Sequence, residues 1–164
     1  MKIYDKLFKE KVKPLFSQAL YCSVATVNEQ GIPHVTPIGS VVLKDKANGW
    51  FFQKFTKNIP ENANNCEFAT IMAVNAGRWF WLKSLLKGSF KEPPAMRILV
   101  KLGQVRPATT EEGEKFKRRV NLFKRTKGYD MMWKDMSHIR EFEIIEYKPV
   151  FIGQMTKNQF KQQK

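Results

Sequence analysis

The first third of the sequence alternates short runs of β-branched and aromatic residues with residues typical of tight turns, and this pattern constrains the fold most. The run at residues 21–27 ends at residues 28–31, whose Asn and Gly have the chemistry of a hairpin loop. Asn48-Gly49 is a second hairpin signal, between expected strands at residues 40–44 and 50–53. Consecutive hairpins of this kind predict an antiparallel sheet.

Further stretches have the composition of strands. They are residues 32–36, 67–74, 97–105, 140–146 and 149–152. Pro33 and Pro37 favour an edge or a bulge for the first of them, because proline cannot donate a ladder hydrogen bond. In the third, Ile98, Val100 and Leu102 share one side, which predicts one buried face.

Helical periodicity appears near both ends of the chain. Residues 2–12 carry apolar side chains at helical spacing, and Pro14 is expected to separate this helix from a short turn at residues 15–20. Later, Thr109 and Glu112 have the spacing of a capping box, and the apolar stripe that follows predicts a helix of about 14 residues.

The length of 164 residues suits one compact domain. We expect a single domain over residues 1–153, with an N-terminal helical segment at 1–20, an aromatic-rich insertion at 75–95, and a polar, basic tail at 154–164. About six short strands with peripheral helices predict a mainly β fold. Its sheet is expected to close into a small barrel, because closure removes exposed strand edges.

The chain is strongly basic, with 29 Lys and Arg against 15 Asp and Glu, a net charge of +14. Residues 115–127 carry seven basic residues and no acidic one. A solvated basic face is the favoured interpretation and polyanion binding the alternative. No zinc-finger, RNA-recognition or zipper pattern is present, so we do not expect a nucleic-acid partner. Without a leader or a run of about 20 apolar residues, we expect a cytoplasmic protein without a membrane partner.

The sequence contains no complete catalytic or metal-binding motif. His34 and His138 have no paired-ligand spacing, so no metal site is expected. Cys22 and Cys66 are interpreted as structural thiols. The glycine-rich phosphate motifs of dinucleotide-binding and P-loop proteins are also absent.

One segment, residues 53–58, has the chemistry of a phosphate site. Lys57 offers a positive charge and Thr56 a hydroxyl, ahead of a short helix expected at residues 60–65 with Asn58 as its N-cap. The free N–H groups at a helix start add further donors for an anion. An ordinary solvated loop remains the alternative interpretation.

The order of these elements resembles the flavin-binding split-barrel family that includes pyridoxamine 5′-phosphate oxidase. Four stretches carry the likeness: the opening hairpin at 23–37, the strand, loop and helix at 50–65, the long strand at 97–105, and the closing strands at 142–152. Together they span roughly residues 15–153. Each motif alone is degenerate, and their order and spacing make the resemblance.

The resemblance implies a six-stranded antiparallel split β-barrel that forms a homodimer, with FMN in the clefts between the subunits. It implies an FMN-dependent oxidoreductase with no catalytic side chain identified. The cofactor-binding positions that it implies are Pro37, Ile38, Gly39, Ser40, Gln53, Thr56, Lys57, Asn58 and Arg97. Thr56 and Lys57 would hold the phosphate, the backbone of residues 37–40 would pass the flavin ring, and Arg97 would approach from the second subunit.

The chain departs from true pyridoxamine phosphate oxidases at two places. Those enzymes have an arginine near the position of Gly39 or Ser40, and an Arg/Trp-rich C-terminus that is absent here. We therefore expect a related FMN-binding protein, or alternatively a non-catalytic module on the same barrel that holds haem or a deazaflavin. The aromatic insertion is interpreted as a satellite core or dimer interface, or else as a cover for the flavin.

Overall fold

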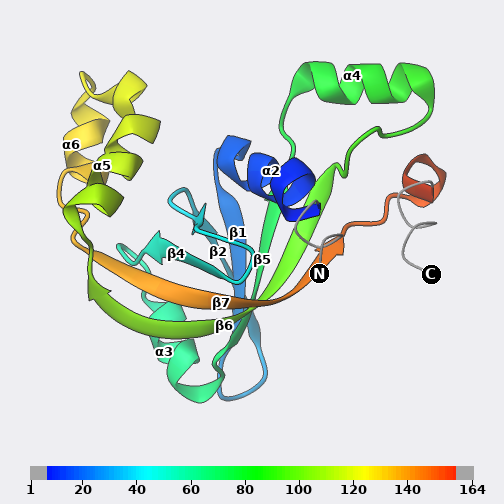
Figure 1. The fold of residues 1–164 in the computed structure, drawn as a ribbon. Helices are drawn as coiled ribbons and strands as arrows, with labels where there is room; N and C mark the ends of the chain where they lie inside the picture. Colours follow the sequence, from blue (N-terminus) through cyan, green and yellow to red (C-terminus); the bar gives the residue numbers. More distant parts are fainter. Residues whose placement is uncertain (1–6, 158–164) are drawn as a thin grey trace.

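The computed structural model describes residues 7–157, and a single antiparallel sheet of seven strands forms its centre (Figure 1). The strand order is β2-β1-β5-β6-β7-β4-β3. The strands are β1 (Cys22–Val27), β2 (Pro33–Ile38), β3 (Val42–Leu43), β4 (Asn48–Phe52), β5 (Phe68–Val74), β6 (Ala95–Pro107) and β7 (His138–Pro149). The mainly β, antiparallel prediction is confirmed, and the expected six strands are corrected to seven.

The sheet curls strongly but does not close. Its two edge strands, β2 and β3, are consecutive in the chain and joined only by residues 39–41. The long strands β6 and β7 are curved along their length (Figure 1). Their pairing shifts register in β6 between Leu99 and Val100 and again between Leu102 and Val105. Such bulges increase the twist of a strand pair. No pairing between β2 and β3 is found in residues 7–157, so a fully closed barrel is not what this chain forms.

The concave side of the sheet encloses the main apolar core. Val24, Ile71 and Ile98, from three neighbouring strands, are completely buried. The N-terminal helical segment, η1 (Phe8–Val12) and α2 (Lys13–Gln18), adds Val12 and Phe16 to the same core. Burial of large apolar side chains is the main favourable contribution to folding here.

The N-terminal helical segment differs from the prediction in one respect. Pro14 lies in the first turn of α2 instead of separating two helices, a position where a missing N–H costs little. The winding changes from π to α at Lys13, so the chain is helical from Phe8 to Gln18. The part of the predicted helix before residue 7 lies outside the described residues.

The first predicted hairpin is confirmed and the second is shifted. The Asn28 Oδ1 accepts hydrogen bonds from the N–H groups of Gln30 and Ile32, which closes the turn between β1 and β2. The turn before β4 is formed by Asp45, not by Asn48-Gly49, which lie inside the strand. A Cβ at Gly49 would lie 2.4 Å from the Phe142 ring, so this glycine permits close packing.

Two helices, α5 (Thr110–Arg119) and α6 (Lys127–Trp133), cover the outer face of the sheet beside β4. The predicted capping box at the start of α5 is confirmed. The helix has 10 residues, not about 14, because the chain bends at Val120 into the short η2 (Asn121–Phe123). The bend lets Val120 pack with Phe52 in a second apolar cluster.

Two further differences concern β7 and the tail. Residues 138–149 form one continuous strand, because the 13-residue β6 offers a partner along its length. The expected separate strand at 149–152 is therefore not formed. After β7 the chain forms η3 (Gly153–Thr156), and the Met155 carbonyl accepts a hydrogen bond from the Phe90 N–H.

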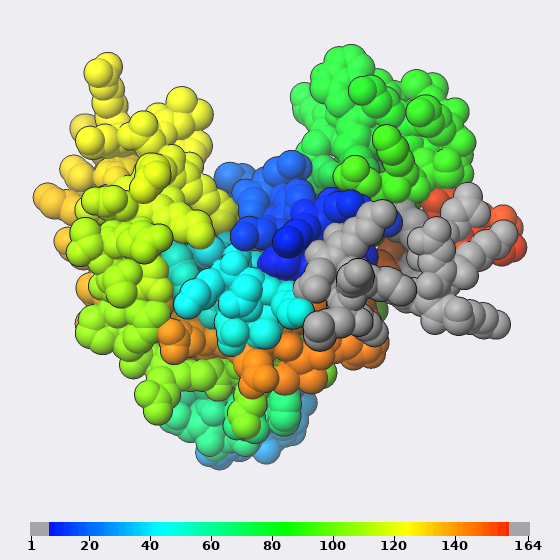
Figure 2. Space-filling model, viewed as in Figure 1, coloured from blue at the N-terminus to red at the C-terminus, as the bar shows by residue number. Residues whose placement is uncertain are grey.

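The aromatic-rich insertion contains α4 (Arg78–Lys87), which ends at Gly88 in the left-handed conformation. This helix projects from the curled sheet on the side opposite to α5 and α6 (Figures 1 and 2). The helix α3 (Asn58–Asn65) lies at the other end of the curled sheet (Figure 1). Within residues 7–157, no helix combines the length and the apolar character needed to cross a bilayer.

Candidate functional site

A pocket of about 240 Å³ lies between the β2–β3 connection, the loop after β4 and the α5–α6 pair. Its lining residues are Thr36, Pro37, Ile38, Gly39, Ser40, Phe52, Lys54, Phe55, Thr56, Phe116, Met132, Trp133 and Met136. The pocket thus brings together the predicted stretch 37–40 and the predicted Thr56, which are distant in sequence. Most of the pocket surface is apolar, and the charged residue among those that line it is Lys54.

The β2–β3 connection is fixed in place by a side chain. Pro37 and Ile38 pair with Ser23 and Cys22 of β1, which sets the end of β2. Ser40 is buried, and its hydroxyl accepts a hydrogen bond from the Phe52 N–H at 3.0 Å. The connection is therefore held against the end of β4, and its backbone forms one wall of the pocket.

Thr56 carries the most informative atom of the pocket. Its Oγ1 is the single side-chain N or O atom in residues 7–157 that is buried without a hydrogen-bond partner. A buried polar group left unpaired costs about 1–3 kcal/mol. The preceding Phe55 has a φ of 61°, so the loop turns sharply before Thr56. A ligand oxygen in the pocket would satisfy this hydroxyl.

Lys57 and Asn58 follow at the start of α3. Lys57 is exposed and occupies the N-cap position, and Asn58 is the first residue of the helix, which corrects its predicted capping role. The Asn58 side-chain nitrogen lies 3.0 Å from the His34 Nδ1 on β2. Neither residue lines the pocket, but they directly follow Thr56 in the chain, and the start of α3 adds the positive end of a helix dipole.

The predicted Gln53 is engaged within the fold. Its Oε1 accepts a hydrogen bond from the Arg140 guanidinium, which also donates to the Gly103 carbonyl at 2.9 Å. Burial lowers the pKa of Arg140, because desolvation disfavours its charged form. Gln53 is not among the pocket-lining residues, so this chain alone does not place it against a ligand.

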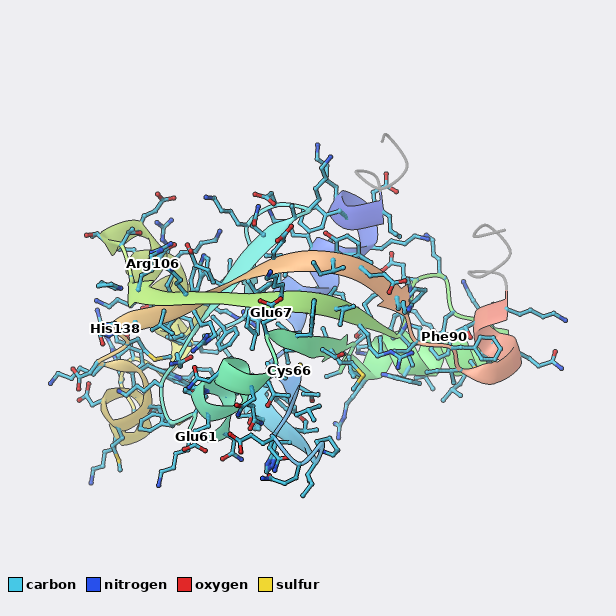
Figure 3. All side chains as sticks on the ribbon, turned by 90° about the horizontal axis from the view of Figure 1, so that it is seen from below. Glu61, Cys66, Glu67, Phe90, Arg106 and His138 are labelled. Carbon is cyan, nitrogen blue, oxygen red and sulfur yellow. The ribbon has the colours of Figure 1, made fainter. Side chains whose placement is uncertain are left out.

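Arg97 lies far from the pocket within one chain. It is exposed on β6, where it pairs with Met72 and Lys148. Nine residues of extended strand, roughly 30 Å, separate it from Arg106 at the pocket end of β6. Figure 3 shows the β6–β7 pair running from Arg106 and His138 toward Phe90. A contact between Arg97 and a ligand in this pocket would require a second copy of the chain.

The α5–α6 wall of the pocket was missed by sequence reasoning. Phe116 packs against Phe52 with ring centroids 5.2 Å apart, and Trp133 belongs to the same cluster. Tyr129, Trp133 and Met136 recur at helical spacing, a signal that could have revealed α6.

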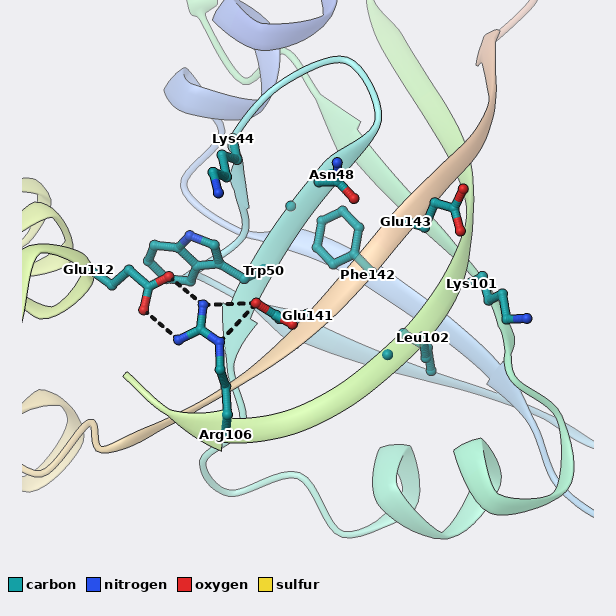
Figure 4. Close-up of a pocket in the computed structure, with 12 residues that line it drawn as sticks. Lys44, Asn48, Trp50, Lys101, Leu102, Arg106, Glu112, Glu141, Phe142 and Glu143 are labelled. Carbon is teal, nitrogen blue, oxygen red and sulfur yellow. Dashed lines mark hydrogen bonds and ion pairs between the residues drawn. The ribbon is translucent and has the colours of Figure 1, made fainter. Parts of the chain in front are cut away.

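A second cavity, of about 370 Å³, lies beside the first turn of α5 (Figure 4). Its central group is Arg106, whose guanidinium contacts Glu112 in a bidentate pair at 2.8 and 2.9 Å and Glu141 at 2.8 Å. The hydrogen bond from Arg106 lowers the pKa of Glu112 to about 2, and the two carboxylates raise the pKa of Arg106. Because its charges pair with each other, we assign this cluster to fastening α5 onto β6 and β7.

The two cysteines differ in their surroundings. Cys22 is buried, and desolvation raises the pKa of its thiol to about 12, as for a structural residue. Cys66 is half-buried. In residues 7–157 no cluster of three or more His, Cys, Asp or Glu side chains is arranged to hold a metal ion.

Comparison with known families gives a clear result. The family model described as pyridoxamine 5′-phosphate oxidase matches residues 8–154. The chain belongs to this family. The match extends from the N-terminal helical segment to η3 and includes both sides of the candidate pocket. A search of curated protein sequences gave no significant match.

Solved structures with the same fold include members of different kinds. An FMN-binding protein from Syntrophomonas wolfei subsp. wolfei has a TM-score of 0.65 and 14% identity, over 92% of this chain and 91% of that chain. A structure described as F420 reductase has a TM-score of 0.57 and 13% identity, over 84% and 96%. HutZ, described as the haem storage protein from Vibrio cholerae, has a TM-score of 0.52 and 10% identity, over 84% and 91%. At these identities the likeness shows the fold of this pyridoxamine 5′-phosphate oxidase family member.

Proposed function

We propose that this chain is an FMN-binding flavoprotein that transfers electrons between FMN and a substrate or redox partner. The observation that carries the proposal is the unpaired, buried Thr56 hydroxyl in an apolar pocket beside a lysine-bearing helix start. FMN combines a large aromatic ring with a phosphate, and the pocket offers apolar and cationic surroundings side by side. Family membership and the similar fold of an FMN-binding protein support the same cofactor.

The phosphate would be held by the loop after β4. Thr56 would donate its hydroxyl hydrogen to a phosphate oxygen, which removes the cost of leaving that hydroxyl unpaired. Lys57 would supply the compensating positive charge, and the first N–H groups of α3 would add donors. Asn58 would orient this helix start through its contact with His34.

The ring would lie along the β2–β3 connection. Residues 37–40 line the pocket on this side, and Phe52 and Trp133, which also line it, would shield the ring from water. When bound, FMN supplies the redox chemistry, and the protein contributes position, polarity and exclusion of solvent. Ser40 would hold the wall in place through its bond to Phe52.

We also propose that two copies of the chain form the complete site. Val35 and Phe55 are exposed next to the pocket residues Thr36 and Thr56, which leaves apolar surface beside the pocket for a partner. Arg97 is remote from the pocket of its own chain, so only a second copy can bring it to the cofactor. The homodimeric split barrel is thus part of the proposed function.

The substrate is proposed to be other than pyridoxamine 5′-phosphate. True pyridoxamine phosphate oxidases carry an arginine near the position that Gly39 and Ser40 occupy here. The Ser40 hydroxyl already accepts a hydrogen bond from the Phe52 N–H. Measurable oxidation of pyridoxamine 5′-phosphate by the FMN-loaded protein would contradict this part of the proposal.

The cofactor assignment is tested by the visible spectrum of the purified protein and by titration with FMN. We expect a flavin spectrum, or uptake of FMN by the colourless protein, and weaker retention in Lys57→Ala. Lys9→Ala, which removes an exposed lysine from η1, serves as the control and should retain FMN. Protein that takes up no FMN would refute the assignment.

The alternative is that the same fold serves as a non-catalytic binding module, with haem or a deazaflavin as its ligand. Parallel titrations with FMN, haem and a deazaflavin separate the cases under one set of conditions. Tighter binding of haem or deazaflavin than of FMN would replace the proposed cofactor. The exposed lysines would favour a deazaflavin with an acidic tail, and added salt would weaken that attraction.

A further inference from the structure

The helix α4 is apolar on two opposite faces. Its inner face packs on the segment that follows it: the Phe80 and Trp81 rings lie 5.6 and 5.2 Å from the Phe90 ring, centroid to centroid. The Trp81 Nε1 donates a hydrogen bond to the Asn75 carbonyl at 2.6 Å. These contacts determine which side of α4 faces the protein, and so which side faces away from it.

The outer face exposes four large apolar side chains. Trp79 is 73% exposed, Leu82 46%, Leu85 62% and Leu86 79%. At about 100° per residue, the four lie within roughly 120° of the helix circumference. A surface helix of a globular protein normally presents polar residues on that side. In the described part of the chain this stripe is left in contact with solvent.

The charges on α4 are all positive. Arg78, Lys83 and Lys87 are exposed, and the helix contains no acidic residue. Helical spacing places Lys83 and Lys87 beyond the Trp79 border of the apolar stripe, and Arg78 within the stripe, in the first turn of the helix. A second copy of the chain packed here through α4 would set cation against cation, in a protein of net charge +14. A negatively charged surface complements these charges.

We propose that the outer face of α4 docks onto the surface of an anionic lipid bilayer. Trp79 would lie at the level of the headgroups, where tryptophan is favoured, and the three leucines would enter the boundary of the acyl chains. Lys83, Lys87 and Arg78 would contact anionic headgroups. We expected no membrane partner because the sequence has no membrane-spanning segment. Docking through the face of a surface helix does not require such a segment.

The position of α4 suits this role. The helix projects from the barrel, and its mass is separated from the α5–α6 pair by a hollow in the surface (Figure 2). The candidate pocket lies on the α5–α6 side of the same chain. The docking face and the pocket of one chain therefore do not overlap, and the inference does not depend on the proposed cofactor.

The test is sedimentation of the full chain with vesicles. One set contains equal amounts of phosphatidylglycerol and phosphatidylcholine, and the other contains phosphatidylcholine alone. We expect binding to the anionic vesicles, little binding to the neutral ones, and a blue shift of tryptophan emission that is lost in Trp79→Phe. The pair Leu85→Gln with Leu86→Gln should weaken binding about tenfold or more, because the apolar contact is lost.

Charge and position are tested by two more variants. Lys83→Glu with Lys87→Glu should weaken binding to anionic vesicles at least about tenfold. Leu122→Gln changes an 89%-exposed leucine outside α4 and should bind like the original chain. Since all these side chains are exposed, circular dichroism should show an unchanged fold.

Three outcomes would overturn the proposal. They are no binding to anionic vesicles, binding that the α4 variants do not change, and a change of oligomeric state caused by Leu85→Gln with Leu86→Gln. The last, measured by light scattering without lipid, would identify the stripe as an interface between copies of the chain. Retention of FMN is measured in the same variants, so that loss of the proposed cofactor site is distinguished from loss of docking.

Discussion

The hydroxyl of Ser40 accepts a hydrogen bond from the backbone N–H of Phe52, at 3.0 Å, across the base of the candidate pocket. The bond joins the connection between the two edge strands to the end of β4. Residues on either side of it, 37–39 and 54–56, line the pocket. One buried side chain thus sets the distance between the wall proposed for the ring and the loop proposed for the phosphate.

Ser40→Ala should destabilise the protein by about 1–3 kcal/mol, because the Phe52 N–H loses its buried partner. The free energy of unfolding is measured by urea denaturation, and FMN affinity should fall with it. Ser17→Ala removes an exposed hydroxyl on α2 and should change stability by no more than about 0.5 kcal/mol. Equal effects of the two substitutions would contradict the role of Ser40.

Thr56→Val should act in opposite directions on stability and on cofactor binding. Without a ligand, the protein should be as stable as before or more stable by about 1 kcal/mol, because a buried unpaired hydroxyl is removed. FMN affinity should fall about tenfold, a loss of about 1.4 kcal/mol. Denaturation of the cofactor-free protein and FMN titration measure the two effects.

Thr56→Ser is the matched control, since it keeps the hydroxyl. It should bind FMN within a few-fold of the original chain. If Thr56→Val retains FMN as well as Thr56→Ser does, the hydroxyl does not contact the phosphate.

The pairing of Arg106 with Glu112 should make stability depend on pH on the acid side. The pKa of Glu112 is lowered from 4.5 to about 2 in the folded chain. Its contribution is therefore fully present above pH 4.5 and is lost as the pH falls toward 2. Glu112→Gln should flatten the stability profile in this window, measured by denaturation at a series of pH values.

Glu114→Gln is the comparison for this profile, because Glu114 forms only an exposed pair with Arg118 at 3.8 Å. Exposed pairs contribute little, so its profile should follow that of the original chain. An unchanged acid slope in Glu112→Gln would show that the Arg106 cluster does not fasten α5.

Gly49→Ala should destabilise the sheet. The new Cβ would meet the Phe142 ring at 2.4 Å and the Val42 carbonyl at 2.7 Å, so backbone or core must move. Overpacking of this kind costs about 1–3 kcal/mol, measurable by thermal or urea denaturation.

Gly113→Ala provides the opposite expectation within the same chain. It lies inside α5 with nothing within 4 Å of the new Cβ, so it should stabilise by about 0.5–1 kcal/mol. A destabilised Gly113→Ala or a neutral Gly49→Ala would contradict the packing described at these positions.

Features that depend on neighbouring residues could be predicted from the sequence. The loop closed by Asn28, the capping box of Thr109 and Glu112, and the buried face of β6 all follow from contacts or alternation within a few residues. The order of these elements was also enough to identify the family. Thr56 could be selected from its loop, although nothing local indicates that its hydroxyl is buried.

Other features were not predictable in this way. Asn48-Gly49 has the strongest local turn preference, yet the pair lies in β4, because Phe142 packs over Gly49 and Asp45 closes the turn. Likewise, the helical spacing of Tyr129 and Trp133 could have revealed α6, but only the folded chain shows that Trp133 packs against the cluster around Phe52.

By itself, the sequence determined most of the secondary-structure elements, their order and the family. These features depend on hydrogen bonds and side-chain alternation between residues that are close in the chain. Only the tertiary structure decided that the sheet stays open, that the Thr56 hydroxyl is buried beside residues 37–40, and that Arg97 lies far from them. These relationships join residues far apart in the chain. Their energies arise from packing and desolvation, which exist only once the chain has folded.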